Sequence, residues 1–208
     1  MGPFTPVRYD QLLDELYLHL PGCSKTLIKG TLIKALRVLC DRTEAWTETL
    51  APVDLVAEQL DYTLTTDWQA YIKRVIQVRK MSADEAAAGF DGSITAPQFY
   101  DFTPPGTLTL NQQLIPRENV TGGMIVKVVL SPLWNAVEIP DWLFNRWAQG
   151  IVARTLFELK AMKSSASSPV PWSDPDGAAF YRTEYNQLLG EIMGDTARGY
   201  TTGGGLRA

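Results

Sequence analysis

Residues 21–46 read PGCSKTLIKGTLIKALRVLCDRTEAW, and this stretch decides how the N-terminal part of the chain is interpreted. Pro21 and Gly22 form a turn signal, and Ser24 is a residue type that often begins a helix. Apolar residues then recur at intervals of three and four, which predicts an amphipathic helix. These residues are Leu27, Ile28, Leu32, Ala35, Leu36, Leu39 and Cys40.

The same stretch contains both cysteines of the chain, Cys23 and Cys40, and it follows the single histidine, His19. Two cysteines and one histidine do not complete a structural zinc site without carboxylate ligands. On one helix the two cysteines lie roughly 25 Å apart, which is beyond the reach of a disulfide. We therefore expect reduced cysteines that pack as small apolar side chains, with no metal and no cofactor. A metal or redox site is the alternative.

Helical periodicity also marks other parts of the chain. Residues 9–20 predict a first helix with Asp10 as its cap, and residues 139–162 predict a long amphipathic helix. Residues 174–193 predict the last helix, with Asp174 as N-cap and Pro175 at its first position.

Between these helices, residues 45–133 are rich in Thr, Val, Leu and Trp with polar residues interleaved, which indicates strands. The pair Gly122-Gly123 is interpreted as a hairpin turn in this region. The predicted fold class is α+β, a helical-bundle body of two N-terminal and two C-terminal helices with a central β-rich insertion of about four to six strands. We expect one composite domain whose parts are residues 1–44, 45–133 and 134–195, followed by a flexible tail at 196–208.

Composition narrows the classes of function. The formal net charge of −4 argues against a surface that mainly binds nucleic acid. No stretch approaches the ~20 apolar residues of a membrane helix, and the N-terminus lacks the apolar segment of a secretory signal. We therefore expect a protein made in the cytoplasm with no membrane partner.

The carboxylate pairs are explained by helix starts and turns, where caps and the helix dipole favour acids. They are Asp10/Asp14/Glu15, Asp84/Glu85 and Asp174/Asp176. His19 has no evident orienting partner for a Ser-His-Asp arrangement, and no nucleophile-elbow or phosphate-loop motif is present. We expect no catalytic residues and no enzyme activity.

Two basic groups stand out. The first contains Lys25, Lys29, Lys34, Arg37 and Arg42, and the second contains Lys73, Arg74, Arg79 and Lys80. Each is either a solvated face or a surface that meets an acidic partner or the DNA backbone.

Three segments carry a resemblance to a known family. The first segment contains LPGC, LCDRTEAW and TETLAPV. The second is VVLSPLWNAVEIPDWLFNRWAQGIVARTLFEL, and the third is PWSDPDGAAFYRTEYNQLLGEI. These segments resemble the head-to-tail adaptor (connector, neck) proteins of tailed bacteriophages, over residues 9–45 and 125–195. The family has no catalytic motif to carry over.

The resemblance implies a structural virion protein that forms a ring, of about twelve copies, between the portal and the tail or nozzle proteins. Genomic DNA passes through the channel of such a ring. The residues expected to face DNA or a partner are Lys25, Lys29, Lys34, Arg37, Lys73 and Arg74. The residues expected to dock on the portal lie in the tail and are Arg198, Tyr200, Leu206 and Arg207. The alternatives are a tail-terminator or other tail-assembly protein, a virion-associated cell-wall hydrolase, and a DNA-binding module in packaging.

Overall fold

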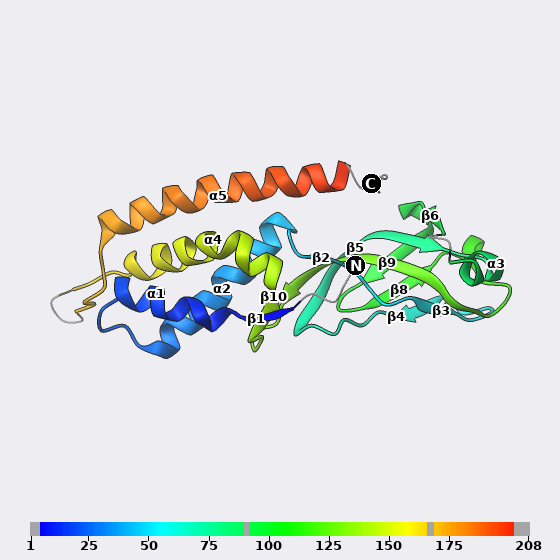
Figure 1. Ribbon diagram of the computed structural model, residues 1–208, viewed down its shortest axis with the longest axis horizontal. Coiled ribbons are helices and arrows are strands. Elements are labelled where there is room, and N and C mark those ends of the chain that lie inside the picture. The colour runs from blue at the N-terminus through cyan, green and yellow to red at the C-terminus, as the bar shows by residue number, and fades with distance from the viewer. Residues whose placement is uncertain (1–4, 90–91, 166–168, 202–208) are drawn as a thin grey trace. The chain divides into compact units, whose positions relative to one another are not determined.

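Figure 1 shows a computed structural model of the chain, which describes residues 5–89, 92–165 and 169–201. Its packing divides into two compact units. The helical unit comprises residues 1–45 and 132–208, and the β unit comprises residues 46–131. The two ends of the sequence therefore form one unit, and the β unit is inserted between them. The predicted α+β class with a central β-rich insertion is confirmed.

Four helices form the helical unit. They are α1 (Leu12–His19), α2 (Lys25–Thr43), α4 (Asp141–Lys160) and α5 (Pro175–Thr201). Strand β1 (Pro6–Arg8) pairs antiparallel with β10 (Glu138–Pro140), so the N-terminal segment is tied to the start of α4. Helix α4 packs against both α2 and α5.

The caps of α2 explain where this helix begins and ends. The Ser24 hydroxyl accepts a hydrogen bond from the Leu27 amide at 3.2 Å, which confirms the predicted cap. At the other end, Glu44 adopts a left-handed conformation with φ of 53° and donates its amide to the Cys40 carbonyl at 2.9 Å. The predicted cap of the last helix is present as well, because Asp174 accepts from the Gly177 amide at 2.9 Å.

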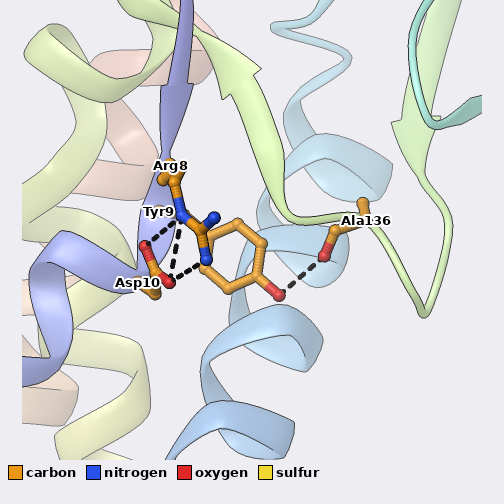
Figure 2. Close-up of polar contacts among 4 residues, drawn as sticks. All are labelled: Arg8, Tyr9, Asp10 and Ala136. Atoms are coloured by element: carbon orange, nitrogen blue, oxygen red, sulfur yellow. Dashed lines mark hydrogen bonds and ion pairs between the residues drawn. The ribbon is translucent and has the colours of Figure 1, made fainter.

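The start of the first helix differs from the prediction. Asp10 does not cap it, and its carboxylate instead accepts a hydrogen bond from the Arg8 guanidinium at 2.7 Å (Figure 2). Residues Tyr9–Gln11 form the 3-10 turn η1 before α1. The buried Tyr9 hydroxyl donates to the Ala136 carbonyl at 2.7 Å (Figure 2). The N-terminal segment is thus anchored to the loop between β9 and β10.

The β unit contains eight strands, one short α-helix and the 3-10 turns η2 (Pro97–Phe99) and η3 (Gln112–Leu114) in its described residues. The strands are β2 (Thr47–Thr49), β3 (Val53–Leu55), β4 (Asp61–Thr63), β5 (Ala70–Lys80), β6 (Ser93–Thr95), β7 (Tyr100–Thr103), β8 (Thr107–Leu110) and β9 (Val120–Pro132). Helix α3 spans Ala83–Ala87 and begins with a capping box formed by Ser82 and Glu85. Several of these strands have only three residues, which is too short for an alternating pattern to stand out. The sequence therefore predicted only about four to six strands.

The strands form two antiparallel sheets. The larger sheet has the order β2-β9-β5-β6, with β3 also paired to β9, and the smaller has the order β4-β8-β7. Alternate residues of β9 are fully buried at Met124, Val126, Val128 and Leu130. Because side chains alternate across a strand, one face of β9 is apolar core over this whole length.

The prediction of a hairpin turn at Gly122-Gly123 is wrong, since both glycines lie inside β9. Gly122 has a φ of +63°, and the pairing register with β3 shifts beside it. A Cβ on Gly123 would lie 2.8 Å from the Val120 Cβ. Glycine inside a strand marks a bulge or a close approach, and both are present here.

Candidate interaction surfaces

The basic residues of α2 point in several directions and mostly have partners within the helical unit. The Lys34 ammonium lies 2.8 Å from a carboxylate oxygen of Glu158 on α4. The Lys25 ammonium lies over the Tyr17 ring, 5.4 Å from its centroid. Arg37 donates to the Pro132 carbonyl at 3.0 Å. These residues therefore do not form one continuous basic patch. Lys29 is exposed, and its positive charge helps to lower the pKa of the Asp10 carboxyl.

Lys34 belongs to a charged cluster that links two helices. Glu158 also pairs with Arg154 one turn earlier on α4, at 2.6 Å. The Arg154 guanidinium in turn lies 5.3 Å from the centroid of the Tyr185 ring on α5. Burial is the main cause that raises the pKa of the Tyr185 hydroxyl. The cluster is an internal stabilising element of the helical unit.

Lys73 and Arg74 occupy neighbouring positions on β5, so they lie on opposite faces of that strand. Arg79 and Lys80 are likewise on opposite faces. The Lys80 ammonium donates to the Leu114 carbonyl at 2.7 Å, and burial lowers the pKa of this amine. The second basic group is therefore divided between two faces of the sheet.

The tail residues fall in two places. Arg198 lies on α5, where its side chain donates to the Gly194 carbonyl at 3.3 Å. We expected the flexible tail to begin at residue 196, whereas α5 continues to Thr201 and includes Tyr200 in its backbone. Leu206 and Arg207 lie outside the described residues.

The cysteines and the histidine lie in different surroundings. Cys23 and Cys40 are both unbridged and buried, and burial is the main cause that raises the pKa of the Cys23 thiol. The His19 ring packs edge-on against Tyr181 with the ring centroids 6.1 Å apart. Within the described ranges, His, Cys, Asp and Glu side chains nowhere gather in threes in a way that fits a metal ion.

One member of each acidic group has a structural partner. Asp10 binds Arg8, Glu85 accepts from the Ser82 amide at 2.8 Å, and Asp174 pairs with the Lys160 ammonium at 3.0 Å. These carboxylates cap or brace helices and turns.

No described helix combines the length and the apolar character that crossing a lipid bilayer requires.

Two features were missed by the sequence analysis. The first is Trp134, whose side chain is 63% exposed in the loop that follows β9. The Arg37 guanidinium lies 4.3 Å from the centroid of its ring. The second is a cavity of about 490 Å³ in the β unit, lined by residues that range from Leu55 to Val120. No local pattern could have revealed the cavity, because its lining comes from separate strands and loops.

Comparison with known proteins gives matches among solved structures only. No protein-family model matches the sequence, and no curated protein matches it. One similar solved structure is described as "Neck of native GTA particle computed with C12 symmetry", with 16% identity, a TM-score of 0.29, and coverage of 87% of this chain and 94% of that chain. Another is "Neck of empty GTA particle computed with C6 symmetry", with 16% identity, a TM-score of 0.31, and coverage of 87% and 91%. At TM-scores this low, the likeness carries no argument about the fold or the role of this chain.

Proposed function

We propose that this chain is a structural virion protein that forms a ring in the neck of a tailed-phage-like particle. The observation that carries the proposal is the composition of the helical unit. Residues 1–45 and 132–208 lie far apart in the sequence but pack as one unit. These two segments contain most of the residues that resemble head-to-tail adaptors. A helical body with amphipathic faces can pack side by side in a closed ring, which is the assembly that this resemblance implies.

The surface of the helical unit supports self-assembly. Large apolar side chains are exposed at Leu18, Trp134, Phe180 and Met193. We propose that some of these side chains contact neighbouring copies, because copies around a closed ring present the same two surfaces to their neighbours. The proposed ring has about twelve copies, as the resemblance implies, and its many contacts act together.

The proposed partners are the portal protein on one side of the ring and tail or nozzle proteins on the other. Genomic DNA passes through the channel. The exposed residues Lys29 and Arg74 are the best placed of the predicted basic residues to face DNA or an acidic partner. Lys34 and Arg37 serve the fold first, because both bind other parts of the helical unit. The protein is made in the host cytoplasm and ends in the virion.

The test is the copy number of this chain in purified particles of its source phage, measured by quantitative mass spectrometry against the portal protein. About one copy per portal subunit supports the adaptor ring. A large excess favours a tail-terminator or tail-tube role instead. Absence from the particle overturns the proposal and leaves a packaging module or an enzyme.

A further inference from the structure

Glu48 is a carboxylic acid on the apolar side of strand β2. Side chains alternate across a strand, so Trp46, Glu48 and Leu50 lie on one face, and backbone hydrogen bonds to β9 continue at both flanking residues, at 2.8 and 2.9 Å. Trp46 and Leu50 are buried. Glu48 itself pairs with Val128 of β9, which is fully buried as well. The carboxyl group therefore projects from between buried apolar side chains.

A loop covers the Glu48 carboxyl. Residues 64–69, between β4 and β5, have no regular secondary structure. The Thr66 hydroxyl of this loop donates to a Glu48 carboxylate oxygen at 3.5 Å, and the Trp68 side chain also forms a hydrogen bond with this carboxyl. The Trp68 ring packs edge-on against Trp46, with the ring centroids 5.7 Å apart. The loop thus contacts β2 through a polar group and an aromatic ring.

The negative charge of Asp67, in the same loop, opposes this arrangement. Burial is the largest cause that raises the pKa of the Glu48 carboxyl, and the charge of Asp67 is the second. The two hydrogen bonds from the loop lower this pKa, with a smaller effect. Lys127 is the charged residue of neighbouring β9, but it pairs with Thr49 and so lies on the other face of the sheet. Ionisation of the carboxyl is therefore unfavourable while the loop covers it.

We propose that Glu48 is a pH-dependent latch, which holds the loop at residues 64–69 closed over β2 when the carboxyl is protonated and loosens it when the carboxyl is ionised. Opening of the loop moves the carboxyl into water and away from Asp67, so both causes that oppose ionisation disappear. The inference concerns the β unit alone and is independent of the proposed neck role.

The direction of the pH dependence follows from linkage. The closed state raises the pKa of the Glu48 carboxyl above its ordinary value of 4.5. Protonation of Glu48 therefore contributes stability that is complete below the ordinary value and is lost as the pH rises through the raised value. Acid tightens the loop, and neutral pH loosens it.

Three variants isolate the contribution of the carboxyl. Glu48→Gln keeps an oxygen that accepts hydrogen bonds from the loop, but it carries no charge at any pH. Asp67→Asn, at an exposed position, leaves Glu48 in place and removes the repulsion. Glu118→Gln neutralises an exposed carboxylate elsewhere in the β unit and is the matched control.

The test is an NMR titration of the full chain that follows the indole resonance and the amide exchange of Trp68. This amide donates to the Thr66 hydroxyl at 3.3 Å, so its protection from exchange reports closure of the loop. In the wild type the resonance should shift with a midpoint above 4.5. Protection should fall through this midpoint, by about tenfold for each unit between the raised and ordinary pKa values. Asp67→Asn should lower the midpoint, Glu48→Gln should abolish both changes, and Glu118→Gln should behave like the wild type.

Thermal unfolding provides a second readout. At pH 7, Glu48→Gln should melt at a higher temperature than the wild type, because it lacks the unfavourable charge. The difference between the two melting temperatures should disappear well below pH 4.5. A difference that is independent of pH overturns the latch.

Two results of the titration also overturn it. One is a Trp68 resonance that titrates in folded Glu48→Gln as it does in the wild type, and the other is amide protection that stays constant through the midpoint. If Glu48→Gln fails to fold, Asp67→Asn decides the question, and an unchanged midpoint in this variant rejects the proposal.

Discussion

The Lys34 ammonium on α2 lies 2.8 Å from the Glu158 carboxylate on α4, and the same carboxylate binds Arg154 at 2.6 Å. The two cations differ in burial, because the side chain of Lys34 is 53% exposed and that of Arg154 only 18%. This difference decides which member of the cluster matters for stability. A charge that loses its partner is tolerated in water but is costly when it is withdrawn from water.

Removal of the shared carboxylate is therefore expected to be the more damaging change. Glu158→Ala leaves Arg154 poorly solvated and unpaired, and should lower the free energy of unfolding by about 3 kcal/mol. Lys34→Ala removes an exposed partner and should cost less than about 1 kcal/mol. Urea unfolding followed by circular dichroism measures both values. Equal losses for the two variants contradict this account.

Two glycines are expected to respond to alanine in opposite directions. Gly30 lies in the interior of α2, and a Cβ there meets nothing within 4 Å. Gly30→Ala should stabilise the protein by about 0.5–1 kcal/mol, the difference in helix propensity. Gly123→Ala should destabilise it, because the new Cβ lies 2.8 Å from the Val120 Cβ. Thermal unfolding of the two variants distinguishes the effects, and a destabilised Gly30→Ala contradicts the prediction.

The helices could be predicted from the sequence, whereas the bulge in β9 could not. Local signals suffice for the helices, because Ser24 and Asp174 are caps and apolar residues repeat at helical spacing. Gly122-Gly123 was misread because a glycine pair in a turn and one in a bulge look alike locally. Only the pairing with β3, far away in the sequence, distinguishes the two, because the register shifts between the Leu55–Val120 pair and the Val53–Met124 pair.

The candidate surfaces were less predictable than the fold. The basic group of α2 suggested one surface, but Lys34 is bound by Glu158, more than a hundred positions later in the sequence. The cavity likewise depends on residues from several strands and loops. Contacts between distant segments decide which charges remain available, and the residue spacing within one helix does not record them.

The two cysteines are expected to serve packing only. Cys40 is fully buried on α2, and Cys23 is buried at the turn before it. The double variant Cys23→Ser with Cys40→Ala should lower the free energy of unfolding by about 1–3 kcal/mol, because a small apolar group is lost from the core and a hydroxyl is placed near it. Elemental analysis should give the same metal content for both proteins. Loss of a stoichiometric metal in the variant contradicts the packing role.

Acid is expected to weaken the start of α5. The Gly177 amide and the Lys160 ammonium lower the pKa of the Asp174 carboxyl below its ordinary value of 3.8. A depressed pKa in the folded state stabilises the fold above the unfolded value, and this stabilisation disappears as the pH falls through the folded value. Asp174→Asn keeps a capping oxygen but removes the charge. The melting temperature of this variant should be below that of the wild type at pH 7, and the difference between the two melting temperatures should disappear in acid. A difference that is independent of pH rules out a charge effect.

Truncation of the tail is expected to separate docking from folding. Helix α5 runs to Thr201, and Asp195 on it binds Arg146 on α4 at 2.6 Å. Deletion of residues 202–208 leaves this ion pair and the helix in place, so the melting temperature should not change. The same deletion removes Leu206 and Arg207, which we propose to contact the portal, and should abolish binding of the chain to purified portal protein.

A longer deletion provides the comparison. Removal of residues 196–208 also takes away the last turn and a half of α5 and Arg198, which lies 3.5 Å from Asp195. This variant should keep the fold at a slightly lower melting temperature and should fail to bind portal in the same way. If either truncated chain binds portal and assembles infectious particles at the wild-type level, the tail is not the docking element. The contact must then come from the faces of the helical or β units, where Lys29 and Arg74 become the next residues to replace.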